Sequence, residues 1–218
     1  AEQQAVLKDA PAETIVVDVP GKSERTMALM AHYDSSTVEE DEDGVVRKVP
    51  GNSYGASDDG YGVAAIVETL RAIKAEGRPP ENSLKIVITD GEEVGLVGAR
   101  NEMRHHRADY ENVDLVLNLE ARGTSGPALM FETSPNNSAV AGYFLSHVKQ
   151  PVAGSLLPSL YARMPNTTDM AAFIPEGFTV LNIAAIGDAE HYHHPTDAPR
   201  YVDHSTLQHY GDQVLDLA

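Results

Sequence analysis

Imidazole and carboxylate side chains occur at five places in the sequence, each at the end of a predicted strand or the start of a predicted helix. These residues are His32 with Asp34, Asp58, Glu92 with Glu93, Glu120, and His193. Imidazoles and carboxylates without sulfur suit a catalytic zinc, manganese or cobalt site rather than a structural zinc site. Each segment alone is more typical of a helix cap or a solvated turn. Their coincidence at element ends predicts a metal centre on one rim of the fold.

The spacing within two of these segments indicates separate roles. Side chains alternate along an extended chain, so His32 and Asp34 point to the same side, and Asp34 can orient the imidazole. Glu92 and Glu93 are adjacent and cannot both face the same way in a regular strand. A turn would let one bind a metal while the other faces a substrate. Two close divalent ions would also need a bridging carboxylate to offset their repulsion.

Alternating apolar patterns predict the elements that must position these side chains. Strands are predicted at 14–19, 26–31, 84–89, 113–119, 128–131 and 179–186, and helices at 58–74, 96–106, 137–148, 168–173 and 204–217. Near-continuous apolar strands are typical of a sheet covered by helices on both faces. We therefore expect an α/β fold built as a layered sandwich.

Two of these helices, and one segment between strands, carry more specific predictions. The helix at 58–74 has an apolar stripe formed by Ala64, Ala65, Val67, Leu70 and Ile73. The helix at 204–217 places Leu207, Tyr210, Val214 and Leu217 on one face. The segment 36–53, with an acidic run at 39–43, is predicted to be a polar, solvated loop.

Composition limits the class of protein. The chain has 218 residues and contains no linker, which favours a single domain over residues 1–218. Thirty-three acidic against 16 basic residues give a net charge of −17, which disfavours nucleic-acid binding. No cysteine is available for disulfides or thiolate sites, and no apolar run reaches the ~18 residues that span a bilayer. The chain starts at Ala1 without methionine, so we expect a processed chain or an excised domain.

Four motifs resemble those of the co-catalytic di-zinc aminopeptidases in order and spacing. They are 31–35 (AHYDS), 55–60 (GASDDG), 91–96 (GEEVGL) and 192–197 (YHHPTD). This family includes secreted bacterial leucyl aminopeptidases and glutamate carboxypeptidase-like enzymes. The segments 118–123 (NLEARG) and 131–133 (FET) most resemble the vacuolar and endoplasmic-reticulum membrane protease branch. The similarity covers about residues 25–217.

The resemblance implies a role for each candidate residue. Asp58 would bridge two Zn²⁺ ions, with Mn²⁺ or Co²⁺ as alternatives. His32 and Glu120 would complete one metal site, and Glu93 and His193 the other. Glu92 would be the general base for a water activated by the two zinc ions, and Asp34 would support His32. The Asp58–Asp59 peptide bond is often cis in the family.

The resemblance also implies a fold, a substrate and a location. The fold would be a three-layer sandwich with a mixed, mostly parallel sheet, and the activity would be removal of N-terminal residues from a peptide substrate. An extracytoplasmic location is implied, and the parent protein of this branch carries transmembrane helices. By the same resemblance, we expect the N-terminal part of the usual catalytic domain to be largely missing from this chain. Side-chain specificity, oligomeric state and amino- versus carboxypeptidase action stay open.

Two departures and two alternatives accompany this resemblance. Many relatives have Asp where Glu120 stands, and many have Ser-Asp where residues 166–169 read Asn-Thr-Thr-Asp. Asp169, Asp188 and Glu190 are either substrate-ammonium ligands or solvated and capping acids. The alternatives are a glutaminyl cyclase, which shares the fold and uses one zinc for acyl transfer, and a non-catalytic binding domain.

Overall fold

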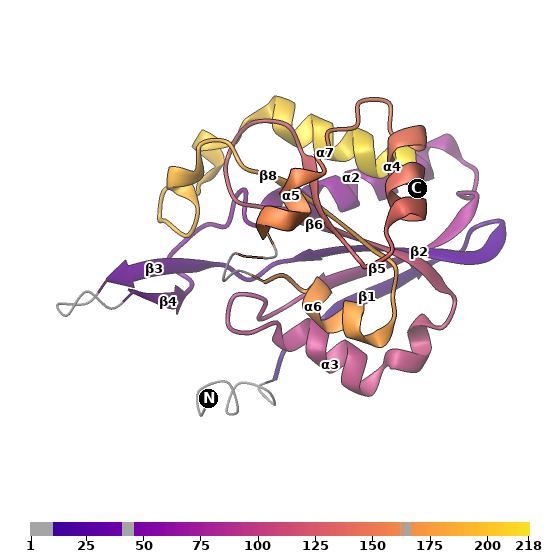
Figure 1. Cartoon of the computed structure of the whole chain (residues 1–218), viewed down its shortest axis with the longest axis horizontal. Helices are drawn as coiled ribbons and strands as arrows, with labels where there is room; N and C mark the ends of the chain where they lie inside the picture. The colour runs from indigo at the N-terminus through magenta and orange to yellow at the C-terminus, as the bar shows by residue number, and fades with distance from the viewer. Residues whose placement is uncertain (1–10, 41–45, 162, 164–166) are drawn as a thin grey trace.

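The sheet at the centre of the molecule has six strands in the order β1-β5-β2-β6-β8-β7 (Figure 1). The computed structural model describes residues 11–40, 46–161, 163 and 167–218. The four inner strands run parallel: β5 (Asn82–Thr89), β2 (Ser23–His32), β6 (Val113–Ala121) and β8 (Val180–Ala185). The edge strands β1 (Ile15–Val19) and β7 (Leu129–Thr133) are antiparallel to their neighbours. The expected mixed, mostly parallel sheet is therefore confirmed.

Helices cover both faces of this sheet, as predicted. On one face lie α2 (Gly60–Glu76), α4 (Ser138–His147) and α7 (His204–Leu217), and on the other α3 (Val97–His105) and α6 (Met170–Phe173) (Figure 1). Alternate strand residues supply the two cores: Leu29 and Leu117 face α2 and α7, while Met30 and Val116 face α3 and α6. Since the inner strands are buried on both sides, they read as continuous apolar runs.

The first long helix, α2, begins two residues later than predicted. Asp59 lies before it as the N-cap, and its carboxylate accepts the Gly62 N–H at 3.0 Å. The predicted apolar stripe was partly wrong, because Ala64 and Val67 are exposed. The buried face is instead formed by Tyr61, Gly62, Ala65, Ile66 and Thr69. Tyr61 and Ile66 are larger than Ala64 and Val67, and their burial determines which face of α2 is turned toward the sheet.

The last helix, α7, confirms its predicted apolar face. Tyr210 and Val214 are fully buried, Leu217 is nearly so, and Leu207 packs against the same core. The Tyr210 hydroxyl donates to the carbonyl of Glu120 and lies 2.5 Å from the Ala185 nitrogen. This helix thereby contacts the ends of β6 and β8, where the candidate residues lie.

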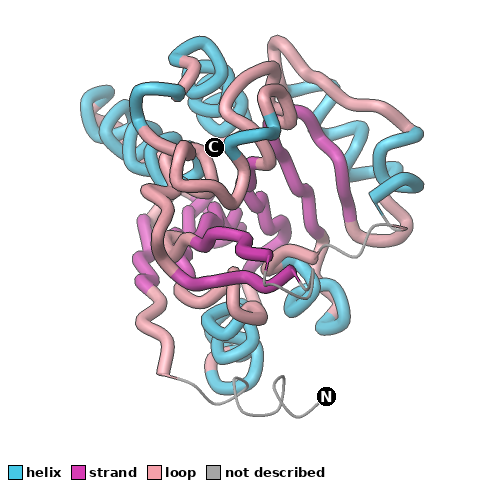
Figure 2. The backbone as a smooth tube through the Cα atoms, turned by 90° about the vertical axis from the view of Figure 1, so that its left-hand side faces the viewer, coloured by secondary structure: helices cyan, strands magenta, loops and turns pink. Residues whose placement is uncertain are grey.

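The segment predicted as a polar loop is a β-hairpin instead. Strands β3 (Ser36–Glu40) and β4 (Val46–Pro50) pair antiparallel, with Val38 opposite Lys48. The β-branched residues Thr37, Val38 and Val49 favour extended backbone, a signal that the acidic run obscured. Residues 41–43 of that run lie outside the described residues. The hairpin extends from the rim of the main sheet and is visible beside it in Figure 2.

Short helical segments complete the described chain. Helix α5 (Leu156–Tyr161), which was not predicted, lies beside β7, with the Tyr161 ring 4.7 Å from the Phe131 ring. Four 3₁₀ turns are η1 (Arg107–Tyr110), η2 (Ile174–Glu176), η3 (Ala189–His191) and η4 (Pro199–Tyr201). Within the described residues, no helix combines the length and apolar character needed to cross a membrane.

Candidate metal centre

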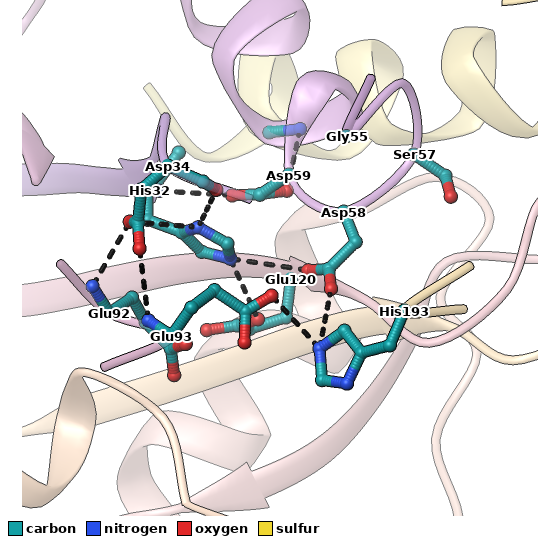
Figure 3. A network of polar contacts seen from close by, with 12 residues as sticks. His32, Asp34, Gly55, Ser57, Asp58, Asp59, Glu92, Glu93, Glu120 and His193 are labelled. Carbon is teal, nitrogen blue, oxygen red and sulfur yellow. Dashed lines mark hydrogen bonds and ion pairs between the residues drawn. The ribbon is translucent and has the colours of Figure 1, made fainter. Parts of the chain in front are cut away.

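The predicted residues converge on one rim of the sheet, beyond the carboxyl ends of the parallel strands (Figure 3). His32 is the last residue of β2, and Glu120 is the penultimate residue of the neighbouring strand β6. Glu93 follows β5, His193 follows β8, and Asp58 precedes α2. Parallel strands end at a common edge, so residues far apart in sequence meet there.

One cluster is formed by His32, Asp58 and Glu120. The His32 Nε2 atom lies 3.2 Å from Asp58 Oδ1 and 3.8 Å from Glu120 Oε2. One potential ligand atom from each residue lies within 4.8 Å of the others, and all three residues are buried. This arrangement of one nitrogen and two oxygen donors could hold a metal ion.

A second cluster is formed by Asp58, Glu93 and His193. The His193 Nε2 atom lies 3.3 Å from Asp58 Oδ2 and 2.9 Å from Glu93 Oε1. These ligand atoms also lie within 4.8 Å of one another, and all three residues are buried. Asp58 thus offers one carboxylate oxygen to each cluster, which is the geometry of a bridging ligand.

Two potential ligand atoms of the second cluster are better suited to binding a divalent cation than to hydrogen-bonding each other. Glu93 Oε1 and His193 Nε2 are buried, and neither has a hydrogen bond of acceptable geometry within the described structure, although the two atoms are close. Buried polar atoms are normally paired, so such atoms need a further partner. A cation placed between them would satisfy both atoms and neutralise the carboxylates.

Asp58 is held in place by Asp197, a residue for which the sequence analysis gave no role. One Asp197 oxygen accepts the Ser57 N–H at 2.8 Å and the Ser57 hydroxyl at 2.7 Å, and the other accepts the Asp58 N–H at 3.0 Å. The Asp58–Asp59 peptide bond is cis, as the resemblance implied. On the far side of that bond, Asp59 accepts the His32 N–H at 3.2 Å (Figure 3).

His32 lies next to Asp34, and its shorter contact is with the backbone carbonyl of that residue rather than with the carboxylate. Its Nδ1 atom lies 3.0 Å from the backbone carbonyl oxygen of Asp34, whereas the Asp34 carboxylate is 3.5 Å away. That carboxylate mainly accepts the backbone N–H groups of Glu92 and Glu93, at 3.0 and 3.1 Å. Asp34 therefore fixes both the imidazole and the turn that carries the two glutamates.

The charges of the two clusters shift the pKa values of both histidines upward. Burial alone would lower the pKa of His32, but hydrogen bonds with Asp34 and Asp58 raise it well above the usual value. Burial likewise opposes protonation of His193, and Asp58 and Glu93 more than offset it, so its pKa is also raised. The surrounding carboxylates therefore favour a positive charge at both histidines.

Glu92 stands beside the clusters without belonging to either. It is 7% exposed, and burial raises its pKa well above the usual value, although His32 opposes the shift. A carboxyl group with a raised pKa near a metal cluster can take up and release a proton. The turn after β5 thus separates the two glutamates, with Glu93 in a cluster and Glu92 next to it.

Comparison with known proteins identifies the family of this chain. The family model described as peptidase family M28 matches residues 14–218. The chain belongs to peptidase family M28. It is 28% identical over 207 residues to a vacuolar membrane protease of Lodderomyces elongisporus, covering 93% of this chain. It is also 28% identical over 168 residues to a putative endoplasmic reticulum metallopeptidase 1 of Schizosaccharomyces pombe, covering 76% of this chain. The M28 chain spans about a fifth of the length of each of these two relatives.

Solved structures share the fold of this M28 chain at low sequence identity. A zinc aminopeptidase from Bacillus subtilis matches with a TM-score of 0.69 and 20% identity, over 94% of this chain and 48% of that one. A Bacteroides thetaiotaomicron glutaminyl cyclase matches with a TM-score of 0.66 and 18% identity, over 99% and 85% of the two chains. The fold is therefore common to two enzyme classes and does not separate them.

The clusters of the M28 chain open into a cavity of about 700 Å³. Asp58, Glu92, Glu93, Glu120 and His193 line its polar part. The apolar wall comes from β7, α5 and the residue that follows β8, and it contains Leu129, Phe131, Leu157, Leu160, Tyr161 and Ile186. A ligand in this cavity would contact both carboxylates and apolar side chains.

Besides Asp197, sequence reasoning missed a second neighbour of the M28 clusters. Lys48, on the hairpin strand β4, places its Nζ atom 2.5 Å from Glu93 Oε2. The Val38 N–H on β3 donates to the His193 carbonyl oxygen at 2.9 Å. The hairpin therefore contacts both turns of the second cluster. Since Lys48 lies in the segment predicted as a solvated loop, the sequence offered no signal for it.

The three further acidic residues of the sequence analysis differ from one another. Asp169 is 2% exposed, and its Oδ2 atom accepts the Thr89 hydroxyl at 2.5 Å. Burial raises the pKa of Asp169 to about 6, although the Thr89 hydrogen bond opposes the shift. Asp169 is therefore not a solvated acid. Asp188 and Glu190 are exposed and do not line the described cavity.

Proposed function

We propose that this chain is the catalytic part of a di-zinc aminopeptidase. The observation that carries the proposal is the position of Asp58, whose two carboxylate oxygens lie 3.2 Å from His32 Nε2 and 3.3 Å from His193 Nε2. A carboxylate shared between two buried clusters is what a pair of divalent ions requires. The donor set of imidazoles and carboxylates suits zinc, and would also accept manganese or cobalt.

In this proposal each ion has two ligands of its own and shares Asp58. His32 and Glu120 would hold one ion, and Glu93 and His193 the other. When bound, the zinc ions would polarise the scissile carbonyl and lower the pKa of a water molecule. The protein's own contribution is to fix the ligand positions and to supply a group that transfers protons.

Glu92 is the proposed proton-transfer group. It lines the cavity beside both clusters, and burial raises its pKa. Its carboxylate would take a proton from the attacking water and return it to the leaving amine. Asp34 acts through Glu92 and His32 as a positioning residue, because it binds the Glu92 backbone and lies next to the His32 ring.

The cavity supports a peptide substrate with a free amino terminus. Carboxylate oxygens of Asp58, Glu92, Glu93 and Glu120 line its polar part, and those not bound to an ion could accept hydrogen bonds from a substrate ammonium group. The apolar wall beside β7 and α5 would receive an apolar N-terminal side chain. Cleavage would then release one residue from the amino end of the peptide.

The relatives suggest where the parent protein works. Those cited above are a vacuolar membrane protease and an endoplasmic reticulum metallopeptidase. We propose that the parent protein is membrane-associated and that this catalytic part faces an extracytoplasmic or organellar lumen.

The test combines metal content with substrate choice. Zinc per chain is measured by mass spectrometry after dialysis, and hydrolysis is followed on leucyl anilide and on a leucyl peptide with a free or acetylated amino terminus. We expect two zinc ions per chain, anilide hydrolysis, and loss of most turnover on acetylation. Equal rates on free and acetylated peptides would reject the aminopeptidase assignment.

The structural match to glutaminyl cyclases makes acyl transfer the second candidate function. It predicts one zinc ion per chain and conversion of N-terminal glutamine to a cyclised product, without hydrolysis of leucyl anilide. The same metal count and a glutaminyl peptide therefore separate the two candidates.

A further inference from the structure

Arg122 is a cation at the edge of the candidate active site that the proposed reaction does not use. Among the described residues lining the cavity, the lysine and the arginine are Lys48 and Arg122. Lys48 is already paired with Glu93. In the described part of the chain, the Arg122 guanidinium has no carboxylate within ion-pair distance, and its recorded side-chain contact is with the Tyr192 ring.

The Tyr192 ring joins Arg122 to the second cluster. The guanidinium carbon lies 5.3 Å from the centre of the Tyr192 ring, and that ring stacks at 3.7 Å on the imidazole of His193. A guanidinium over an aromatic face is attracted by the ring and is held in a restricted set of positions. The Tyr192 ring therefore lies between Arg122 and His193, a residue of the candidate metal centre.

The backbone at Arg122 is also firmly held. Its N–H donates to the Ala185 carbonyl oxygen at 2.8 Å, directly after the paired ends of β6 and β8. At the next residue, Gly123, an added Cβ would lie 2.0 Å from the Gly187 carbonyl oxygen, so only glycine fits this approach. The side chain of Arg122 thus starts from a fixed point on the cavity rim.

The charges around the Arg122 guanidinium indicate which substrate group it would bind. The chain carries a net charge of −17, and four carboxylates line the same cavity. The two ions of the proposed centre would offset these carboxylates, and Arg122 then remains a cation on the cavity rim that could receive a substrate carboxylate. The planar guanidinium can bind a carboxylate through two parallel hydrogen bonds, which a lysine cannot do.

We propose that Arg122 binds a carboxylate on the residue that follows the scissile bond, so that the enzyme prefers dipeptides or peptides with an acidic second residue. This inference rests on the proposed peptidase function and adds a substrate class to it. Arg122 is the specificity-determining residue, and Tyr192 positions its guanidinium.

Three substrates with the same N-terminal residue distinguish the sources of the carboxylate. They are leucyl-alanine, leucyl-alanine amide and leucyl-glutamate amide, which carry a terminal carboxylate, none, and a side-chain carboxylate. For the wild-type protein loaded with zinc, we expect kcat/KM to be at least about 10-fold higher for one or both acids than for leucyl-alanine amide, mainly through a lower KM. A charge-assisted hydrogen bond has a strength that matches this ratio.

The variant Arg122→Gln should reduce that preference to about one, and Arg122→Lys should retain only part of it. Arg200→Gln is the matched control, because Arg200 also lies over a ring, 4.8 Å from the centre of Tyr201, but does not line the cavity. It should keep the wild-type preference. Zinc content and circular dichroism show that each variant is folded and loaded.

The outcomes separate the two proposals. Hydrolysis of all three substrates at equal rates, or a preference that persists in Arg122→Gln, would overturn the role of Arg122 while leaving the peptidase function in place. Failure to hydrolyse any of the three, together with leucyl anilide, would overturn the peptidase function and this inference with it.

Discussion

The two halves of the candidate metal centre are built differently. The strand-borne half consists of His32 and Glu120, which lie at the ends of the neighbouring strands β2 and β6. The turn-borne half consists of Glu93 and His193, which lie in turns after β5 and β8. Asp58 connects the halves. Similar donors on the two sides are thus positioned by different physical means.

The core of the sheet positions the strand-borne half. The Asn118 side-chain amide donates to Glu120 Oε1 at 3.1 Å and to Asn182 Oδ1 at 3.1 Å, and both asparagines are buried. The Tyr210 hydroxyl donates to the Glu120 carbonyl. These contacts leave Glu120 Oε2 facing His32.

Side-chain and loop contacts position the turn-borne half. The Asp34 carboxylate accepts the Glu93 N–H, and Lys48 forms an ion pair with the Glu93 carboxylate. His193 has a φ of +54°, which is uncommon for a non-glycine residue, and stacks on Tyr192. The comparison teaches that sheet residues and the packed helix α7 hold Glu120, whereas Glu93 and His193 depend on neighbours from the hairpin and loops.

Removal of the shared ligand should have the largest effect. We expect Asp58→Ala to lose both zinc ions and all measurable activity, because each cluster loses a ligand and the two ions lose the charge between them. Zinc is counted after dialysis. The control is Asp203→Ala, which removes the carboxylate that caps α7 and should keep two ions. Two tightly bound ions in Asp58→Ala would refute the bridging role.

The adjacent glutamates should separate chemistry from metal binding. Glu92→Gln should lower kcat by at least ~100-fold with two zinc ions retained, because the amide cannot accept a proton. Glu93→Gln should instead release zinc from the turn-borne half. Kinetics and metal content are measured on the same samples. Exchanged phenotypes would reverse the assignment of the pair.

Loss of the Asn118 amide should weaken only the strand-borne half. We expect Asn118→Ala to lower the zinc affinity of one site by about 10–100-fold, the range typical of partners that orient ligands, and to leave the other site near its wild-type affinity. Competition with a zinc chelator measures both affinities. Asn137→Ala, at an exposed hydrogen bond with Thr133, is the control. Equal weakening of both sites would remove the distinction between the halves.

Acid should release zinc from both halves. Of these predictions, it is the one in which the two halves differ least. The metal-free pKa values of His32 and His193 are raised, so each imidazole is more protonated at a given pH than an ordinary histidine. A ligand must lose its proton to bind zinc, so affinity falls as the pH is lowered through these pKa values. Because both pKa values are shifted in the same direction, both halves should lose zinc affinity as the pH falls. Chelator competition between pH 8 and pH 6 measures this, and affinities independent of pH would contradict it.

The sequence predicted the elements that carry the strand-borne half well. Continuous apolar runs such as that of β6 can be buried only in the middle of a covered sheet, and the polar residues at their ends then meet at one edge. The positions of His32 and Glu120 follow from that pattern. The different positions of Glu92 and Glu93 also follow from the sequence, because a turn is the simplest way to direct two adjacent side chains to different places.

The surroundings of the turn-borne half were not predictable in the same way. The acidic run obscured the strand signal of the hairpin, and the contact of Val38 with His193 joins residues far apart in the sequence. In the sequence, Lys48 therefore could not be distinguished from an ordinary charged residue of a solvated loop. Asp197 was part of a recognised motif, but its hydrogen bonds to Ser57 and Asp58 span about 140 positions. Such contacts become visible only when the fold is known.

The central claim is that Asp58 bridges two ions, and anomalous diffraction at the zinc edge from zinc-loaded crystals tests it most directly. We expect two peaks about 3.5–4 Å apart, one on each side of the Asp58 carboxylate. One peak should contact His32 and Glu120, and the other Glu93 and His193. A single peak, or two peaks that do not share Asp58, would contradict the account.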